Sequence, residues 1–156
     1  FELQNNISGI GPAKDGDLHL ELDALTNSRV RQTVSTVAGQ TYEFSFWYSP
    51  RPAVEQDSNA VAVFWDGGLL DTVFETGIGI TGTIWTLQTY QVIASGTSTD
   101  IDFAGTGPAD LKGGLIDVVS LVAVAGPGAP VPEPATLFLF GFALAGIAAT
   151  RRKRAR

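Results

Sequence analysis

The stretch Ala38-Gly39-Gln40-Thr41-Tyr42-Glu43-Phe44-Ser45-Phe46-Trp47-Tyr48 decides the fold of this chain. Its first three residues are typical of a turn, and aromatic side chains then recur at every second position. A period of two is that of a β-strand with one buried face, so the aromatic set is expected to face a core. This set consists of Tyr42, Phe44, Phe46 and Tyr48. The residues between them, including Trp47, are expected to face outward.

Short stretches with strand-like patterns also lie on both sides of this one. They are Leu18–Asp23, Val30–Val34, Asn59–Trp65, Leu69–Phe74, Thr83–Ala94, Asp100–Ala104 and Gly114–Ala125. Asp66-Gly67-Gly68 predicts a tight hairpin, and Asn59–Trp65 is apolar on both faces, which is typical of a central strand. No helical periodicity occurs before Ala135. About eight short antiparallel strands predict an all-β fold, a two-sheet sandwich of the jelly-roll kind.

Charge is distributed unevenly along the chain. Five of the ten Lys and Arg residues lie in 151–156, so residues 1–150 carry the other five against all sixteen acids, a net charge of −11. Such an acidic body is a poor partner for nucleic acid, which is bound through basic patches. There is no cysteine, which excludes disulfides, thiolate metal sites and cysteine catalysis.

The C-terminal part combines an uncharged run with a basic end. Residues 135–150 contain no charged side chain, and Arg151, Arg152, Lys153, Arg154 and Arg156 follow them. At ~1.5 Å per residue, a helix over this run would be roughly 24 Å long, somewhat short of a ~30 Å hydrocarbon core. The basic tail should stay on the cytoplasmic side, so residues before 131 are expected on the other side of the inner membrane. The predicted organisation is therefore a sandwich at 1–125, a Gly/Pro linker at 126–134, a transmembrane helix at 135–150 and a basic tail at 151–156.

Val131, Pro132, Glu133 and Pro134, followed by this short apolar run and the Arg-rich end, resemble the PEP-CTERM sorting signal of Gram-negative bacteria. The resemblance implies cleavage near Pro132–Pro134 by an inner-membrane, transpeptidase-like protease, an exosortase. It also implies delivery of the domain to the cell surface or the exopolysaccharide matrix. The alternative is a permanent C-terminal membrane anchor.

The chain begins at Phe1 and shows no basic segment followed by an apolar stretch at its start. Export requires a signal peptide, so we expect the sequence to be truncated or already processed there.

A second resemblance rests on the order of four loose motifs. They are Asp15–Asp23, Val30–Val34, Ala38–Phe46 and Leu115–Leu121, and together they look like the galactose-binding-like sandwiches, a group with many non-catalytic carbohydrate-binding modules. These domains usually begin with one more strand ahead of Phe1–Gln4, so the resemblance implies that the first strand is missing.

The same resemblance implies a structural Ca²⁺ between an early loop and the last strand. Oxygen ligands are what Ca²⁺ requires, and the candidates by position are Asp15, Asp17, Glu21 and Asp117. Asp117 interrupts a long apolar run, where an unpaired carboxylate would be costly. The alternative for Asp117 is a carboxylate that accepts hydrogen bonds from a loop N–H or faces solvent.

Glycan binding needs an exposed aromatic face beside hydrogen-bonding groups. Trp47 faces away from the expected core and lies near Tyr48 and Arg51, so these three are the candidate glycan-binding residues. Trp65 and Trp85 are expected in the interior, because sandwiches bury most of their aromatic side chains.

Catalysis has little support in the sequence. His19 is the single histidine and is expected to face solvent, and Glu21 with Glu43 is the acid pair that could act as in a glycosidase. The spacing of Gly77–Gly82 matches a dinucleotide-binding loop, but the strand-like residues after it predict an ordinary loop. The leading hypothesis is a non-enzymatic, exported surface or matrix protein with a glycan-binding or structural sandwich. The alternatives are a surface hydrolase acting on matrix polysaccharide and a permanently anchored domain that binds a protein partner.

Overall fold

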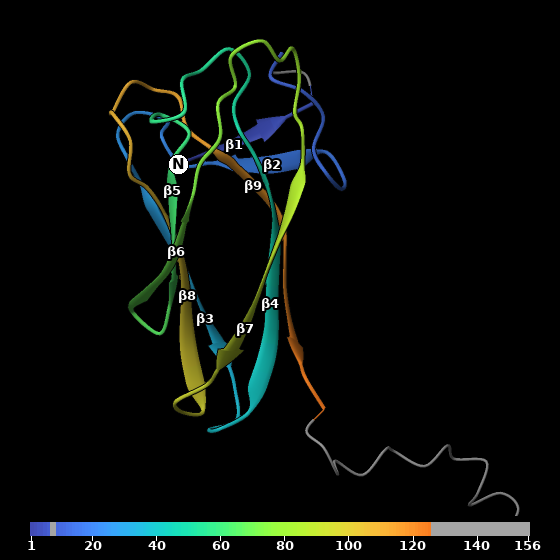
Figure 1. Ribbon diagram of the computed structural model, residues 1–156, viewed down its shortest axis with the longest axis vertical. Helices are drawn as coiled ribbons and strands as arrows, with labels where there is room; N and C mark the ends of the chain where they lie inside the picture. Colours follow the sequence, from blue (N-terminus) through green and yellow to red (C-terminus); the bar gives the residue numbers. More distant parts are fainter. Residues whose placement is uncertain (7–8, 126–156) are drawn as a thin grey trace, which may run out of the picture. The chain divides into compact units, whose positions relative to one another are not determined.

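The computed structural model describes residues 1–6 and 9–125, and these residues form nine β-strands and no helix (Figure 1). The strands are β1 (Glu2–Asn5), β2 (Leu18–Glu21), β3 (Arg29–Ser35), β4 (Thr41–Ser49), β5 (Val61–Trp65), β6 (Gly68–Val73), β7 (Thr86–Ile93), β8 (Ser98–Gly105) and β9 (Leu115–Ala123). The predicted linker, transmembrane helix and basic tail lie outside the described residues.

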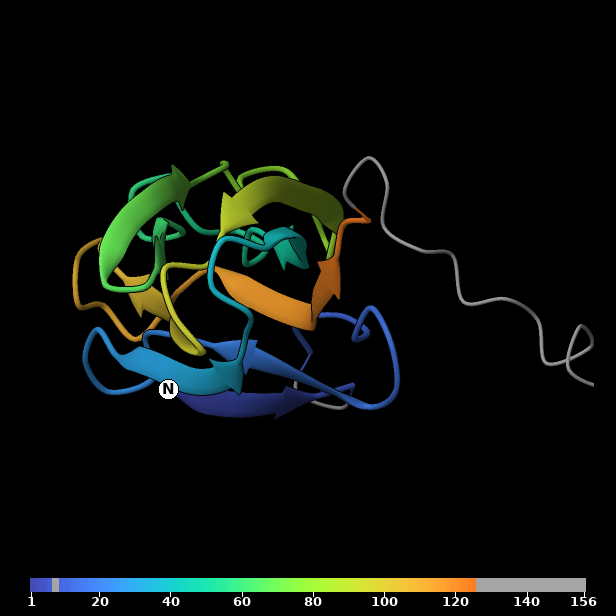
Figure 2. The same cartoon turned by 90° about the horizontal axis from the view of Figure 1, so that it is seen from below.

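The strands form two antiparallel sheets that face each other (Figures 1 and 2). One sheet has five strands in the order β1-β2-β9-β4-β7, and the other has four in the order β3-β8-β5-β6. This arrangement confirms the all-β sandwich of two antiparallel sheets. The ninth strand, one more than the eight expected, is β1. It is a short edge strand paired with β2, and the residues of β1 show no clear alternation.

The predicted hairpin joins β5 and β6. Trp65 pairs with Gly68 across a two-residue turn, and both turn residues, Asp66 and Gly67, have positive φ angles of 51° and 80°. Positive φ at both central positions is what a type I′ turn requires, and Asp-Gly tolerates it. β5 lies between β6 and β8, so its prediction as a central strand is also confirmed.

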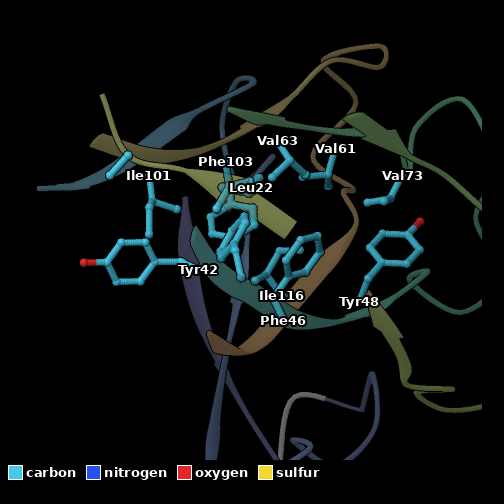
Figure 3. Packing of buried hydrophobic residues seen from close by; sticks show 13 residues of the cluster. Leu22, Tyr42, Phe46, Tyr48, Val61, Val63, Val73, Ile101, Phe103 and Ile116 are labelled. Atoms are coloured by element: carbon cyan, nitrogen blue, oxygen red, sulfur yellow. The ribbon is translucent and has the colours of Figure 1, made fainter. Parts of the chain in front are cut away.

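The aromatic face of β4 forms the middle of the core (Figure 3). Phe44 and Phe46 are completely buried, and the ring of Phe46 meets that of Phe103 edge-on with 4.9 Å between centroids. Val61 and Val63 of β5 close the cluster from the opposite sheet. Burying one such side chain is worth about 1.5–3 kcal/mol, so this face alone supplies a large part of the driving force.

Strand β2 departs from the simple alternation expected of it. Leu18 is half exposed, whereas His19 and Glu21 on the opposite face are buried. The prediction that His19 faces solvent is wrong, because loops from other parts of the chain cover the outer face of β2 at this point.

Two further segments differ little from expectation. β7 begins at Thr86 rather than Thr83, and Gly77–Gly82 lies in a loop that no helix follows.

Within the described ranges, no helix is long and apolar enough to cross a membrane.

Candidate functional site

The outer face of the five-stranded sheet presents the indole of Trp47 in one row and polar side chains in the next rows. Trp47 of β4 lies opposite Asp117 of β9 on one side and Leu87 of β7 on the other. Residues paired across strands share a face, so these side chains point away from the core that Phe44 and Phe46 occupy. Trp47 is partly exposed and Leu87 is about half exposed.

The next rows along the same face are polar. Ser45 lies between Ser120 and Thr89, and Glu43 lies beside Gln91 one row further. Hydroxyl, amide and carboxylate groups therefore stand within a few strand spacings of an indole and a leucine side chain. We call this surface the Trp47 platform, formed by Trp47, Leu87, Ser45, Thr89, Ser120 and Lys14.

Lys14 enters the platform from the early loop. Its Nζ lies 3.7 Å from the centroid of the Trp47 ring, a cation–π contact. The loop is fastened there by Asp117, whose Oδ2 accepts hydrogen bonds from the backbone N–H groups of Lys14 at 2.8 Å and Asp15 at 3.2 Å. Its Oδ1 accepts a third, from the N–H of Val118 at 2.7 Å.

A second anchor holds the same loop from the segment just before β7. The carbonyl oxygen of Pro12 accepts hydrogen bonds from Trp85 Nε1 at 3.0 Å and from Thr83 Oγ1 at 2.7 Å. Trp85 is only partly buried, so the expectation that it lies in the interior is wrong.

His19 lies beneath this loop. Its ring meets that of Trp85 at 5.7 Å between centroids, it is 1 % exposed, and neither ring nitrogen has a hydrogen-bond partner in the described part of the chain. Burial lowers the pKa of His19, against the opposing charges of Asp117 and Glu21. His19 is therefore a neutral packing residue rather than an accessible base.

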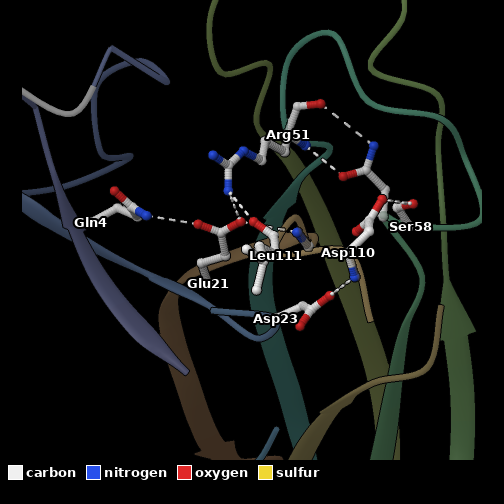
Figure 4. A network of polar contacts seen from close by, with 9 residues as sticks. Gln4, Glu21, Asp23, Arg51, Ser58, Asp110 and Leu111 are labelled. Carbon is white, nitrogen blue, oxygen red and sulfur yellow. Dashed lines mark hydrogen bonds and ion pairs between the residues drawn. The ribbon is translucent and has the colours of Figure 1, made fainter. Parts of the chain in front are cut away.

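A polar network fills the loop end of the sandwich (Figure 4). The fully buried carboxylate of Glu21 accepts hydrogen bonds from Gln4 Nε2 at 2.7 Å and from the N–H of Gly113 at 2.9 Å, and it forms an ion pair with Arg51. Arg51 also donates to the carbonyl oxygen of Leu111 at 3.2 Å. The network ties β1, β2 and the loops after β4 and β8 into one unit.

Two of the three predicted glycan-binding residues occupy other roles. Tyr48 is buried, and its hydroxyl donates to the carbonyl oxygen of Asn59 at 3.0 Å and accepts from the N–H of Glu75 at 3.2 Å. Burial raises the pKa of Tyr48. Arg51 faces Glu21, so of the three only Trp47 lies on the outer sheet face.

The four predicted calcium ligands do not form a common site. Across the described residues there is no group of three or more acidic or histidine side chains that could hold a metal ion. N–H groups and a guanidinium already satisfy Asp117 and Glu21, while Asp17 accepts from Asn6 Nδ2 at 3.3 Å. Asp15 contacts Asp117 through its backbone N–H, which donates a hydrogen bond to the Asp117 carboxylate. The alternative reading of Asp117, a carboxylate that holds a loop by its N–H groups, is the one observed.

The predicted acid pair is far apart. Glu21 is level with Leu115 and hence with Ser49 of β4, and Glu43 lies six residues further along β4. At about 3.3 Å per residue this separation is roughly 20 Å, whereas glycosidase carboxylates stand about 5–9.5 Å apart. Glu21 and Glu43 therefore cannot act together.

Sequence reasoning found Trp47 but missed most of its neighbours. Leu87, Thr89 and Ser120 join it through strand register, which a single sequence does not reveal. Lys14 joins it through a loop whose path depends on Asp117.

The C-terminal segment was compared with known protein families. Residues 130–153 match the model of the PEP-CTERM protein-sorting motif, and this range includes Val131–Pro134. The chain carries a PEP-CTERM sorting motif. The PEP-CTERM motif implies an exported protein that is processed at the membrane.

Solved structures similar to the sandwich that precedes the PEP-CTERM motif are carbohydrate-binding modules. A family 35 module from an environmental isolate is 13 % identical with a TM-score of 0.55, over 81 % of this chain and 92 % of that one. The family 35 module of Paenibacillus barcinonensis is 20 % identical with a TM-score of 0.51, over 79 % and 92 %.

A third similar structure is a mannanase that contains such a module. The Podospora anserina GH26-CBM35 β-(1,4)-mannanase is 18 % identical with a TM-score of 0.53, over 80 % of this chain, and the chain spans a quarter of its length. At these identities the likeness shows the fold, a carbohydrate-binding-module-like sandwich. A search of the curated proteins gave no match.

Proposed function

We propose that this protein is a non-enzymatic glycan-binding component of the cell surface or exopolysaccharide matrix, brought there by its PEP-CTERM motif. The observation that carries the proposal is the Trp47 platform, a partly exposed indole beside hydroxyl-bearing rows on a sandwich of carbohydrate-binding-module type. In this proposal the sorting motif directs the protein to the surface or matrix, and the platform binds the glycan.

The chemistry of the platform suits a sugar ring. A pyranose has an apolar C–H face, which packs against an indole and a leucine side chain, and a rim of hydroxyl groups. Ser45, Thr89 and Ser120 can donate to and accept from those hydroxyls. Lys14 is exposed, so its side chain can move off the Trp47 ring, which leaves the indole to the sugar, and its ammonium can then donate to a sugar hydroxyl.

The C-terminal segment would act during export, before the sandwich binds the glycan. In this proposal the run at 135–150 holds the chain in the inner membrane with Arg151–Arg156 in the cytoplasm, and an exosortase cuts near Pro132–Pro134. The Gly/Pro linker at 126–134 and the sandwich at 1–125 are then released together to the surface or matrix.

Binding to exopolysaccharide purified from the producing strain tests the platform. Trp47→Ala should weaken binding roughly tenfold in calorimetry, since an aromatic stacking contact is worth up to about 1.5 kcal/mol beyond the apolar area it buries. Phe74→Ala removes a half-exposed aromatic side chain elsewhere on the sandwich and should leave binding unchanged. Equal affinity of the Trp47→Ala and unsubstituted proteins would overturn the proposal.

A further inference from the structure

The row of the platform that contains Trp47 is closed on one side. In this row Trp47 lies between Asp117 of β9 and Leu87 of β7. The backbone of the early loop lies against the carboxylate of Asp117, which accepts hydrogen bonds from the N–H groups of Lys14 at 2.8 Å and Asp15 at 3.2 Å. A ligand that packs on Trp47 therefore cannot continue along the row over β9.

The other side of the row is apolar and exposed. Leu87 is directly opposite Trp47 in the β4–β7 register, so the two side chains are neighbours on one face, and Leu87 is about half exposed. Neighbouring strands lie about 4.8 Å apart, close to the length that one sugar adds to an extended glycan chain. Two successive sugar rings can therefore pack on this row, one on the indole and one on the leucine.

The rows further along β4 favour this direction over one that follows the strands. A chain running along β4 would place its second ring over Ser45 and its third over Glu43, which offer hydrogen bonds but no apolar surface. A chain running across the strands keeps both rings on apolar side chains. Its hydroxyl groups then face Ser45 and Thr89 in the next row.

We propose that the Trp47 platform recognises the end of a glycan chain, with the terminal sugar on Trp47 and the next sugar on Leu87. This inference rests on the proposed function and names the part of the glycan that is bound. A terminal sugar keeps a free hydroxyl where an internal sugar carries its second glycosidic linkage. Lys14, whose Nζ lies 3.7 Å from the centroid of the Trp47 ring, is placed to donate to that hydroxyl once it has moved off the ring.

Shortening the glycan tests the proposal on the full chain. Exopolysaccharide purified from the producing strain is cut by partial acid hydrolysis, and calorimetry measures the number of binding sites per gram before and after. For a site that binds chain ends, this number should rise in proportion to the number of ends. A site that binds internal sugars would keep the same number of binding sites per gram or lose some of them.

Two substitutions test the contact with the second sugar, using fragments of one and of two sugars from the same hydrolysate. Leu87→Ser should weaken binding of the two-sugar fragment about fivefold and leave binding of the single sugar unchanged, because only the second ring contacts Leu87. Val122→Ser removes an apolar side chain of similar exposure from the same sheet face, opposite Glu43, and should change neither affinity.

The outcomes separate this inference from the proposed function. Sites per gram that stay constant or decrease as the chains are shortened would overturn chain-end recognition, and so would equal weakening of both fragments by Leu87→Ser. If these results occur while Trp47→Ala still weakens binding, the glycan site stands and only the chain-end inference fails. If Trp47→Ala leaves binding of the polysaccharide unchanged, the proposed function fails, and the inference fails with it.

Discussion

His19 couples the stability of the sandwich to pH. The folded state lowers its pKa, so the unfolded chain, with a histidine pKa near 6.5, binds the proton more readily. Stability should therefore be complete above about pH 6.5 and should decrease as the pH falls through and below it. Urea denaturation from pH 8 to pH 5 measures this slope. Since His19 is the single histidine, His19→Leu should flatten it, and an unchanged slope in that variant would refute the assignment.

Removing the charge of one partner in the Glu21–Arg51 ion pair should lower the free energy of unfolding substantially. Glu21→Gln leaves the guanidinium of Arg51, which is one-quarter exposed, without its charge partner, and should cost about 3 kcal/mol in the free energy of unfolding. The double variant Glu21→Gln/Arg51→Gln should lose less than the sum of the single variants. Glu55→Gln, an exposed acid, is the control. Additive losses in urea denaturation would show that the two side chains are not coupled.

Single residues show where sequence reasoning succeeds. The aromatic alternation of β4 predicted the core because every second residue there faces the opposite sheet. The same argument failed for His19, because burial of the outer face of β2 is caused by a loop from residues 10–17 and by Trp85. Such cover is a tertiary effect that no local period contains.

At the level of elements, Asp117 determines where the early loop lies. Asp117→Asn replaces one acceptor oxygen by an amide donor, so a backbone N–H of the loop or of Val118 loses its partner, at a cost of about 1–3 kcal/mol. The amides of Lys14 and Asp15 should then exchange hydrogen at least tenfold faster. Asp71→Asn changes a carboxylate of β6 that accepts hydrogen bonds from the N–H of the adjacent Thr72 and from the hydroxyl of Tyr90 on β7, and it should leave the amides of Lys14 and Asp15 unchanged. If both variants leave them protected, Asp117 does not hold the loop.

Strand boundaries and turns were predictable to a similar degree. Asp66-Gly67 identified the β5–β6 hairpin because so few residues accept positive φ at two successive positions. The order of the strands in the sheets was not predictable, since it depends on pairings between residues as distant as Glu21 and Leu115. The surroundings of the predicted calcium ligands were not predictable for the same reason: Asp117 and Glu21 meet N–H groups and a guanidinium from segments far away in the sequence.

For the whole molecule, the PEP-CTERM motif predicts a change of mass. Protein taken from the membrane of the producing cell before processing should retain Arg151–Arg156, and protein from the surface or matrix should end near Pro132–Pro134. Intact-mass spectrometry of both fractions measures this difference. Replacing Pro132–Pro134 with alanines should leave the longer form in both fractions. A surface form that retains Arg151–Arg156 would instead favour the permanent anchor.

The segment that carries the sorting motif follows β9, and β9 is the third of five strands in its sheet. A mechanical load on that segment therefore enters the domain along β9, whose C-terminal half is paired with β4. Seven residue pairs join β9 to β4 side by side, so a pull along β9 would strain these bonds together instead of opening them one after another. A protein held by its C-terminal end against flow would resist extension through this geometry.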